Sequence, residues 1–276
     1  MKSKADWQKM KIRTNNKGCS IIKDLIQPKL MDLESLYCGI EESRAMKELI
    51  EKNYYLQKIK QSEVMLVAGG RLEENTEIAS YMVLNTLLVE NKAVFYFSLG
   101  RYKNDLISMF LCLDTGLKYE YIKRGVFTEL DWAKIINSAH KLSEKLLYIC
   151  DLQLREIKII EQIEKLHKEA EIKKQNLSLV IIDYFQLIQC KKFSKQKISE
   201  MLKLLKQVAI KLKITIVLLW QFDYNFSKNP DEFIVPKFED TQEFYIIKKN
   251  TDFIGLIDPY ENIFKVYKPN VQEISF

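Results

Sequence analysis

Short apolar segments alternate with longer segments of helical periodicity from Val64 onward. The apolar segments are rich in Val, Ile, Phe and Tyr, which favour strands. We expect strands near residues 64–68, 93–99, 146–150, 178–183, 214–220, 253–257 and 263–267. The clearest helix is expected over 197–213, where apolar residues recur on one side and lysines fill the other. Strands separated by helices indicate an α/β fold, a mainly parallel sheet flanked by helices.

The first 60 residues differ from this pattern. The opening stretch is polar, Pro28 interrupts the next stretch, and residues 41–60 have helical periodicity. The apolar side of that helix consists of Met46, Leu49, Ile50 and Leu56. We therefore expect an N-terminal helical arm over residues 1–60 and one globular domain over residues 61–276.

Composition narrows the class of protein. The 276 residues are 47% apolar, enough for one full core, and the net charge of +6 permits a nucleic-acid partner without demanding one. The five cysteines are widely spaced without a C-x-x-C pair, which fits a reducing cytoplasm. Neither of the two histidines belongs to a metal-ligand spacing, and no apolar run has a membrane-spanning length. We expect a cytoplasmic protein with no membrane contact.

A glycine pair, Gly69 and Gly70, separates an apolar segment from a helical one. A phosphate-binding loop needs such glycines, a lysine for the terminal phosphates, and a hydroxyl for magnesium, all at a helix N-terminus. The segment lacks the lysine. The local pattern favours the alternative, a strand, a turn and a helix whose acidic first turn suits the helix dipole.

Asp183 ends the apolar run from Leu179 to Ile182. In nucleoside triphosphatases a carboxylate at such a strand end holds magnesium through water. An aspartate that caps the following turn is an equally good interpretation.

The order of the segments resembles the C-terminal, RecA-like domain of DnaB-type replicative DNA helicases. The similarity covers about Val64 to Ile257 and is carried by four stretches: FSLGRYKNDLISMFLC, IKRGVFTELDWAKIINSAHKLSEKLLYICD, LVIIDYFQLIQ and KISEMLKLLKQVAIKLKITIVLLWQ. The resemblance implies a RecA-like P-loop NTPase fold and a ring-forming motor that uses ATP, magnesium and single-stranded DNA. The implied nucleotide-binding positions are Gly69, Gly70, Glu74, Asn75, Thr76, Asp183 and Gln221. Gln221, at the family's sensor glutamine, is equally well read as a polar strand end.

The sequence departs from the family at the positions of the family's phosphate-binding and catalytic residues. Asn75 stands at the loop lysine, Glu74 at the loop's final glycine, and Gly100 at the glutamate that polarises the attacking water. The trans-acting arginine falls near Pro269, and no Arg follows Arg155. Loss of one unlike-charge contact near 4 Å can remove about 4 kcal/mol. We therefore expect no catalytic residues and no cofactor, with Thr76 and Asp183 as metal ligands only if magnesium is bound.

A basic stretch follows the Asp183 motif. In the family, single-stranded DNA is held by loops in this region, and phosphate contacts with one stacked base would suit such a loop. The candidate DNA-binding residues are Lys191, Lys192, Phe193, Lys195 and Lys197. The composition favours the alternative, a solvated lysine loop.

Together these features predict a DnaB-like protein with a degenerate nucleotide site, a pseudo-ATPase that serves as a DNA- or helicase-binding module in DNA replication. One alternative is an active, atypical ATP-dependent helicase that uses other residues, such as Arg71. A second is an adaptor whose N-terminal arm engages a replicative helicase or its loader. The oligomeric state stays open.

Overall fold

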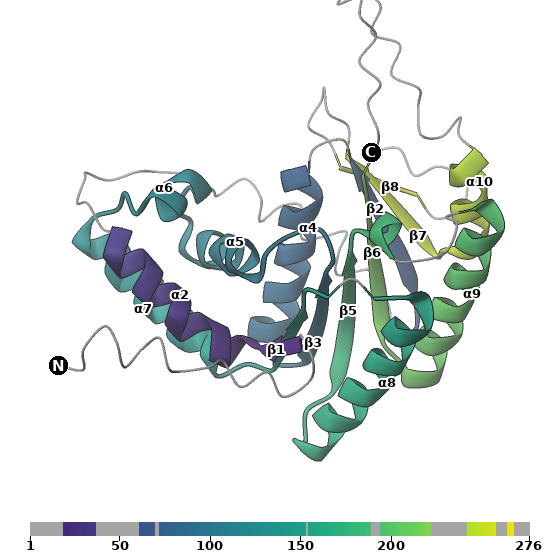
Figure 1. Cartoon of the computed structure of the whole chain (residues 1–276), viewed down its shortest axis with the longest axis horizontal. Helices are drawn as coiled ribbons and strands as arrows, with labels where there is room; N and C mark the ends of the chain where they lie inside the picture. The colour runs from purple at the N-terminus through teal and green to yellow at the C-terminus, as the bar shows by residue number, and fades with distance from the viewer. Residues whose placement is uncertain are drawn as a thin grey trace, which may run out of the picture.

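The computed structural model describes residues 19–36, 61–69, 72–152, 154–188, 194–221, 242–257 and 264–267. Within these ranges the chain forms one eight-stranded sheet covered by helices (Figure 1). The strands are β1 (Cys19–Ile21), β2 (Val64–Gly69), β3 (Ala93–Ser98), β4 (Leu147–Cys150), β5 (Leu177–Asp183), β6 (Thr215–Gln221), β7 (Phe253–Ile257) and β8 (Phe264–Tyr267).

The strand order is β1-β4-β3-β5-β6-β2-β7-β8. The six strands from β4 to β7 pair in parallel, whereas β1 and β8 add antiparallel edges. All seven expected strands are present within about two residues of their predicted ends. The prediction of an α/β fold with a mainly parallel sheet is confirmed.

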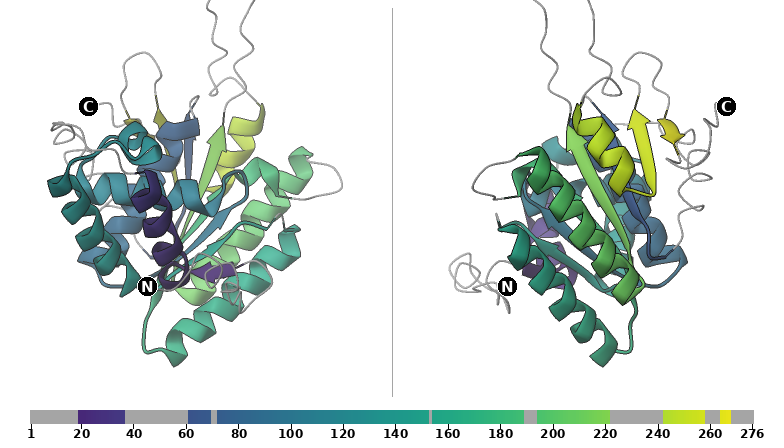
Figure 2. Two further views of the ribbon diagram at one scale, coloured as in Figure 1. Left: turned by 60° about the vertical axis from the view of Figure 1, so that its left-hand side comes forward. Right: turned by 90° about the vertical axis from the view of Figure 1, so that its right-hand side faces the viewer.

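Helices cover both faces of the sheet (Figure 2). One face carries α2 (Ile22–Leu36), α4 (Leu72–Leu84), the π-helical turn η1 (Asn85–Val89), α5 (Lys103–Thr115), α6 (Tyr119–Arg124) and α7 (Glu129–Ser143). The other face carries α8 (Glu156–Ile172), the short 3-10 helix η2 (Phe185–Leu187), α9 (Lys195–Leu212) and α10 (Gln242–Asn250). Strand side chains alternate between these layers: Leu66 packs into the α8–α9 layer, while Met65 and Val67 pack into the α4–α5 layer. Because both faces of the sheet are buried, the sequences of its strands are nearly continuous apolar runs.

The helix expected over 197–213 is α9. Its apolar stripe packs on the sheet, and its N-terminus is capped by Ser194, whose hydroxyl accepts a hydrogen bond from the Lys197 amide at 3.4 Å. Lys213 ends the helix in the left-handed conformation, with φ of 54°. No helix in the described ranges is long and apolar enough to cross a membrane.

Part of the expected N-terminal arm belongs to the domain. β1 pairs with β4, and α2 buries Ile22 and Leu33 in the same core as α5 and α7. Pro28 was expected to interrupt this stretch but lies inside α2, since packing against the domain outweighs the local cost of proline. The rest of the arm prediction, including the helix over 41–60, lies outside the described residues.

Candidate functional site

The parallel register brings several predicted residues to one edge of the sheet. Gly69 ends β2 directly opposite Gln221, which ends β6, and Asp183 ends β5. Asn75 and Thr76 lie in the first half of α4, which begins three residues after β2. These side chains therefore meet where the carboxyl ends of parallel strands form the ligand crevice of open α/β sheets.

Asn75 points into the protein and is fully buried. Its Nδ2 donates to the carbonyl oxygen of Trp220 at 3.0 Å and to that of Gly69 at 3.4 Å. Its Oδ1 is buried and has no hydrogen-bond partner among the described residues. The side-chain amide of Asn75 thus links α4 to the ends of β2 and β6 by hydrogen bonds.

Asp183 is buried at the end of β5. Its Oδ2 accepts hydrogen bonds from the Tyr96 hydroxyl at 2.7 Å and from the Thr76 hydroxyl at 3.3 Å. Its Oδ1 has no hydrogen-bond partner in the described part of the chain. Burial raises the pKa of the carboxyl to about 6, and the Tyr96 hydrogen bond, the positive charge of Arg101 and the Thr76 hydrogen bond oppose this rise.

Arg101 is a site residue that the sequence did not single out. Its carbonyl accepts a hydrogen bond from the Ser98 hydroxyl at 2.9 Å, and the Leu99 and Gly100 amides donate to the Asp183 carbonyl at 2.6 and 3.3 Å. This turn holds the guanidinium near Asp183, where its charge lowers the pKa of the carboxyl. The chain itself therefore supplies a cation near Asp183. The only signal for this in the sequence was that Arg101 directly follows Gly100, the position of the family's glutamate.

Tyr184 covers the same spot. Its hydroxyl lies 3.5 Å from the Thr76 hydroxyl and receives a hydrogen bond from Arg101. Burial, followed by the charge of Asp183, raises the pKa of this tyrosine to about 12, so it stays protonated at neutral pH.

Gly100 is exposed but closely flanked by two side chains. A Cβ atom there would lie 2.9 Å from Leu187 Cδ1 and 3.2 Å from Tyr184 Cδ2. A larger side chain at this position therefore requires the Leu187 side chain to move and the Tyr184 ring to shift by a few tenths of an ångström.

Gln221 is held through its backbone by a neighbouring glutamine. The side chain of Gln186 accepts from the Gln221 amide at 3.2 Å and donates to the Gln221 carbonyl at 2.6 Å. The end of β6 is thereby fixed to η2, the segment that follows Asp183.

Some of the remaining predicted site residues lie outside the residues that the structure describes. Gly70, Pro269 and the expected DNA contacts 191–193 lie outside the described residues, as does the side chain of Glu74. Lys195 and Lys197 form the first turn of α9, and the Lys197 ammonium is ion-paired with Glu200 at 2.9 Å. Lys197 also lines a hollow beside Phe185, which follows Asp183 by two residues.

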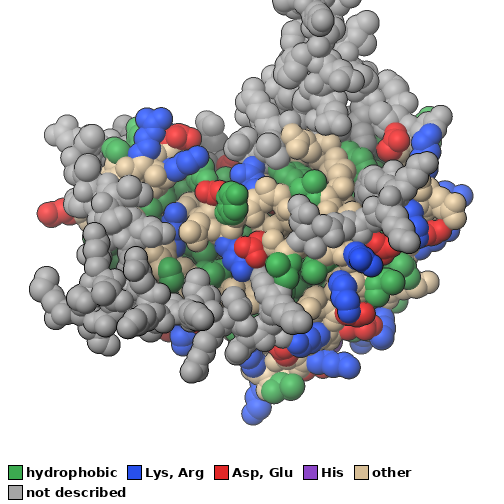
Figure 3. Space-filling model, in the orientation of Figure 1, with side chains coloured by type: hydrophobic (Ala, Val, Ile, Leu, Met, Phe, Trp, Pro, Cys, Tyr) green, Lys and Arg blue, Asp and Glu red, His purple; other side chains and the backbone are tan. Residues whose placement is uncertain are grey.

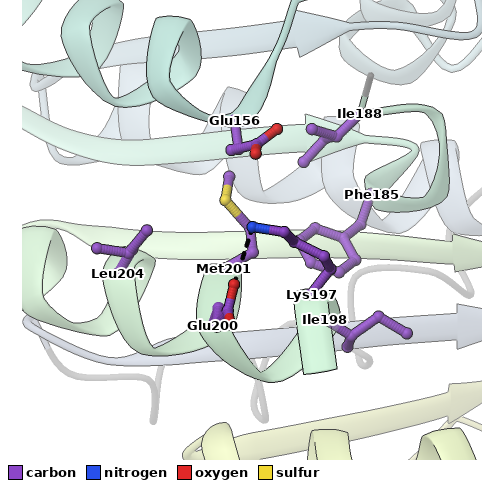
Figure 4. Close-up of a pocket in the computed structure, with 8 residues that line it drawn as sticks. All are labelled: Glu156, Phe185, Ile188, Lys197, Ile198, Glu200, Met201 and Leu204. Atoms are coloured by element: carbon purple, nitrogen blue, oxygen red, sulfur yellow. Dashed lines mark hydrogen bonds and ion pairs between the residues drawn. The ribbon is translucent and has the colours of Figure 1, made fainter. Parts of the chain in front are cut away.

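A small surface hollow of about 40 Å³ lies between η2 and the start of α9. Phe185 and Ile188 face Met201 across it, with Lys197 and Glu200 at its rim (Figure 4). On the face shown in Figure 3, basic and acidic side chains are interspersed over the α8–α9 side. Ion pairs such as Lys211 with Glu164, at 2.7 Å, join α9 to α8. Within the described ranges, no three His, Cys, Asp or Glu side chains are grouped as metal ligands.

Comparisons with known proteins agree with this geometry. The family model described as DnaB-like helicase C terminal domain matches residues 47–273. The replicative DNA helicase DnaB of Geobacillus stearothermophilus is 26% identical over 208 residues, covering 73% of this chain and 44% of the relative. A probable plasmid replicative DNA helicase of Chlamydia psittaci is 26% identical over 194 residues, covering 69% of this chain and 41% of the relative. The chain thus spans less than half the length of these relatives.

Solved structures show the same fold. One of them, described as an ATPase domain, superposes with a TM-score of 0.63 at 20% identity, covering 87% of this chain and 84% of that one. A DnaB-like replicative helicase, whose structure was described with its interactions with primase, gives a TM-score of 0.60 at 19% identity and covers 87% of this chain and 63% of its own. The RecA-like fold that the resemblance implied is confirmed.

Proposed function

Since this chain belongs to the family of DnaB-like helicase C-terminal domains, we propose that it acts in DNA replication as a non-hydrolysing domain that binds DNA or a replicative helicase. The replicative setting is suggested by the relatives, which are named as replicative DNA helicases. The absence of hydrolysis is suggested by the hydrogen bonds at the strand ends.

Asn75 is the observation that carries the proposal. A phosphate-binding loop requires a cation at this position and free backbone amides. Here a neutral amide is buried, and both hydrogens of its Nδ2 are directed to carbonyls of Gly69 and Trp220. A side chain engaged in this way supplies no charge to a phosphate.

The neighbouring residues also fit magnesium and nucleotide poorly. Thr76 and Asp183 are the oxygen pair expected at the metal, but the Thr76 hydroxyl lies against Asp183 and Tyr184, and Asp183 is buried beneath them. Magnesium keeps several waters when it binds, so it needs an open oxygen site. The chain's own Arg101 already offsets the Asp183 charge. We therefore derive no chemical step through a bound nucleotide.

Titration calorimetry with ATP and magnesium tests this proposal directly. We expect no binding tighter than about millimolar, because the loop cation is missing. A steady-state ATPase assay should give the same rate for the wild type and for Asp183→Asn, which keeps the side-chain shape but removes the charge. Micromolar affinity, or turnover that Asp183→Asn abolishes, refutes the non-hydrolysing assignment.

An atypical active ATPase is the second candidate, because one specific observation favours it. Arg101 places a cation within electrostatic reach of Asp183, although the sequence-based alternative named Arg71, which lies outside the described residues. If Arg101 compensates for the lost loop lysine, Arg101→Met should abolish nucleotide binding. If the site is closed, Arg101→Met leaves the absence of binding unchanged.

Single-strand binding is the first candidate activity of the module. Charge removal at Lys191, Lys192 and Lys195 should weaken binding to all DNA sequences alike and reduce the salt slope by about 0.7 per lost contact. Lys197 is expected to contribute less, because Glu200 already pairs with it. Matched charge removal from three exposed lysines elsewhere, Lys118, Lys123 and Lys141, should leave the slope unchanged. Equal slopes for both variants identify the 191–197 stretch as solvated surface.

Binding of a helicase or loader is the other candidate activity, and we place it on residues 37–60. The periodic apolar residues of 41–60 need a cover, which a partner can supply. We expect a monomer or weak oligomer by light scattering, and we expect deletion of 37–60 to abolish co-purification with a replicative helicase. A stable hexamer without nucleotide contradicts the first expectation, and full binding by the deletion variant contradicts the second.

A further inference from the structure

Two cysteines face each other at the sheet edge farthest from β8. Cys19 in β1 is the direct antiparallel partner of Cys150 in β4, and both side chains lie in the same core layer. Directly opposed residues of antiparallel strands have Cα atoms about 4.5 to 5.5 Å apart. Disulfides usually span Cα separations of about 4.4 to 6.8 Å, so the backbone already holds this pair at bonding distance.

The two thiols lie close enough to shift each other's pKa. The interaction with Cys19 lowers the pKa of Cys150 despite its burial, with a smaller contribution from the Leu152 backbone, whereas the pKa of Cys19 is raised by Cys150 and by burial. Cys150 is therefore the sulfur that carries the thiolate more readily.

A lysine fastens the same pair of strands. Lys103, the first residue of α5, donates from its ammonium to the Ser20 hydroxyl at 3.1 Å and pairs with Asp151 at 3.0 Å. Ser20 follows Cys19 in β1, and Asp151 follows Cys150 at the end of β4. The Lys103 charge lowers the pKa of Cys150, but the neighbouring Asp151 charge raises it by more, so this ion pair holds the two strands together without favouring the thiolate.

We propose that Cys19 and Cys150 form a modification site, a dithiol that small-molecule disulfides convert reversibly into an intramolecular disulfide. The proposal rests on strand register, shared burial and the thiol contact, and it stands apart from the proposed function. Because β1 is a three-residue edge strand, its local opening is the expected route of access to the two cysteines, which as residues are 6% and 0% exposed.

The chemistry balances with a small disulfide as oxidant. The Cys150 thiolate attacks one sulfur of the small disulfide, and one small thiolate leaves. Cys19 loses its proton to solvent, attacks the Cys150 sulfur of the mixed disulfide, and displaces the second small thiolate. The protein gives up two protons and two electrons, and the small disulfide takes up both to become two thiols.

The bond would fasten the first described strand to the sheet. Cys19 and Cys150 are roughly 130 residues apart in the chain, so the disulfide constrains a long loop of the unfolded state. The oxidised protein should therefore melt several degrees above the reduced protein, and a reducing agent should reverse the shift.

The test uses the full chain with Cys38, Cys112 and Cys190 changed to Ser, which leaves only the proposed pair. After exposure to oxidised glutathione, we expect both thiols to be lost, with an intact mass lower by two hydrogens and no glutathione attached. Addition of Cys19→Ser to this variant is the matched control, in which no loss of two hydrogens can occur.

Peptide mapping of the wild type is the second measurement, because it needs no substitution. The non-reduced digest should contain one cross-linked species that joins the Cys19 and Cys150 peptides, and reduction should remove it. Attachment of glutathione to either cysteine as the final product, survival of both thiols, or a cross-link that excludes one of them overturns the proposal.

Discussion

Replacement of Asp183 by Asn should remove a specific pH dependence of stability. Burial raises the pKa of this carboxyl from its ordinary value of 3.8 to about 6. The folded protein therefore binds the Asp183 proton more tightly than the unfolded chain does. Stability from this group is fully present below pH 4 and is lost as pH rises through about 6. Two pKa units correspond to roughly 3 kcal/mol.

Urea denaturation from pH 4 to pH 7.5, followed by tryptophan fluorescence, measures this effect. We expect the free energy of unfolding of the wild type, minus that of Asp183→Asn, to fall by roughly 3 kcal/mol across the window. The asparagine oxygen can still accept the hydrogen bond that Tyr96 donates at 2.7 Å, so the variant should fold. A difference that stays flat with pH refutes the reasoning, because Asp183 would then not titrate differently in the folded state.

Asp131→Asn is the matched control with the opposite sign. Although burial raises the pKa of Asp131, hydrogen bonds from the Thr128 amide and hydroxyl and from Lys134 outweigh it and lower the pKa. Asp131 belongs to the capping box of α7. Its substitution should therefore reduce stability above pH 4, with the deficit shrinking as pH falls.

Three further variants, one of them a double substitution, probe the same region. Glu74→Gly combined with Asn75→Lys should restore measurable ATP binding by calorimetry without hydrolysis, since Gly100 still supplies no base; a variant that binds nothing locates the defect elsewhere. Gly100→Glu should lower the free energy of unfolding by about 1–3 kcal/mol without turnover, because a Cβ atom meets a leucine at 2.9 Å, and a wild-type unfolding midpoint would contradict this. Gln186→Ala should expose the backbone of Gln221 and cost about 1–3 kcal/mol, seen as faster amide exchange at that residue; unchanged exchange would show that the pair contributes little.

The sheet could be predicted because its strands are buried on both faces. Runs such as residues 93–98 and 177–183 are apolar almost without interruption, and long periodic helices separate them. β1 escaped prediction because three residues carry no detectable period. Pro28 was misread for a related reason, since the packing that holds α2 depends on distant residues.

The site could be predicted from strand ends and from the family resemblance. Asp183 was identified because strand termini converge in a parallel sheet, whereas Asn75, Thr76 and Gln221 were identified only through the resemblance. Tyr96, inside a buried strand, could not be distinguished from an ordinary core aromatic, and its role appears only when β3 pairs with β5. Arg101 was missed because its approach to Asp183 depends on a turn fixed by backbone hydrogen bonds.

The polar groups at this edge of the sheet are directed at one another, which bears on nucleotide affinity. A ligand that recruits Thr76 and Asp183 must break the hydrogen bond between them, and one that recruits Asn75 must free its amide from the Trp220 carbonyl. At about 1–1.5 kcal/mol per buried hydrogen bond, breaking both weakens binding by roughly 30-fold to 150-fold. This cost adds to the missing loop cation, so restoration of the lysine alone should recover only part of the affinity of an open site.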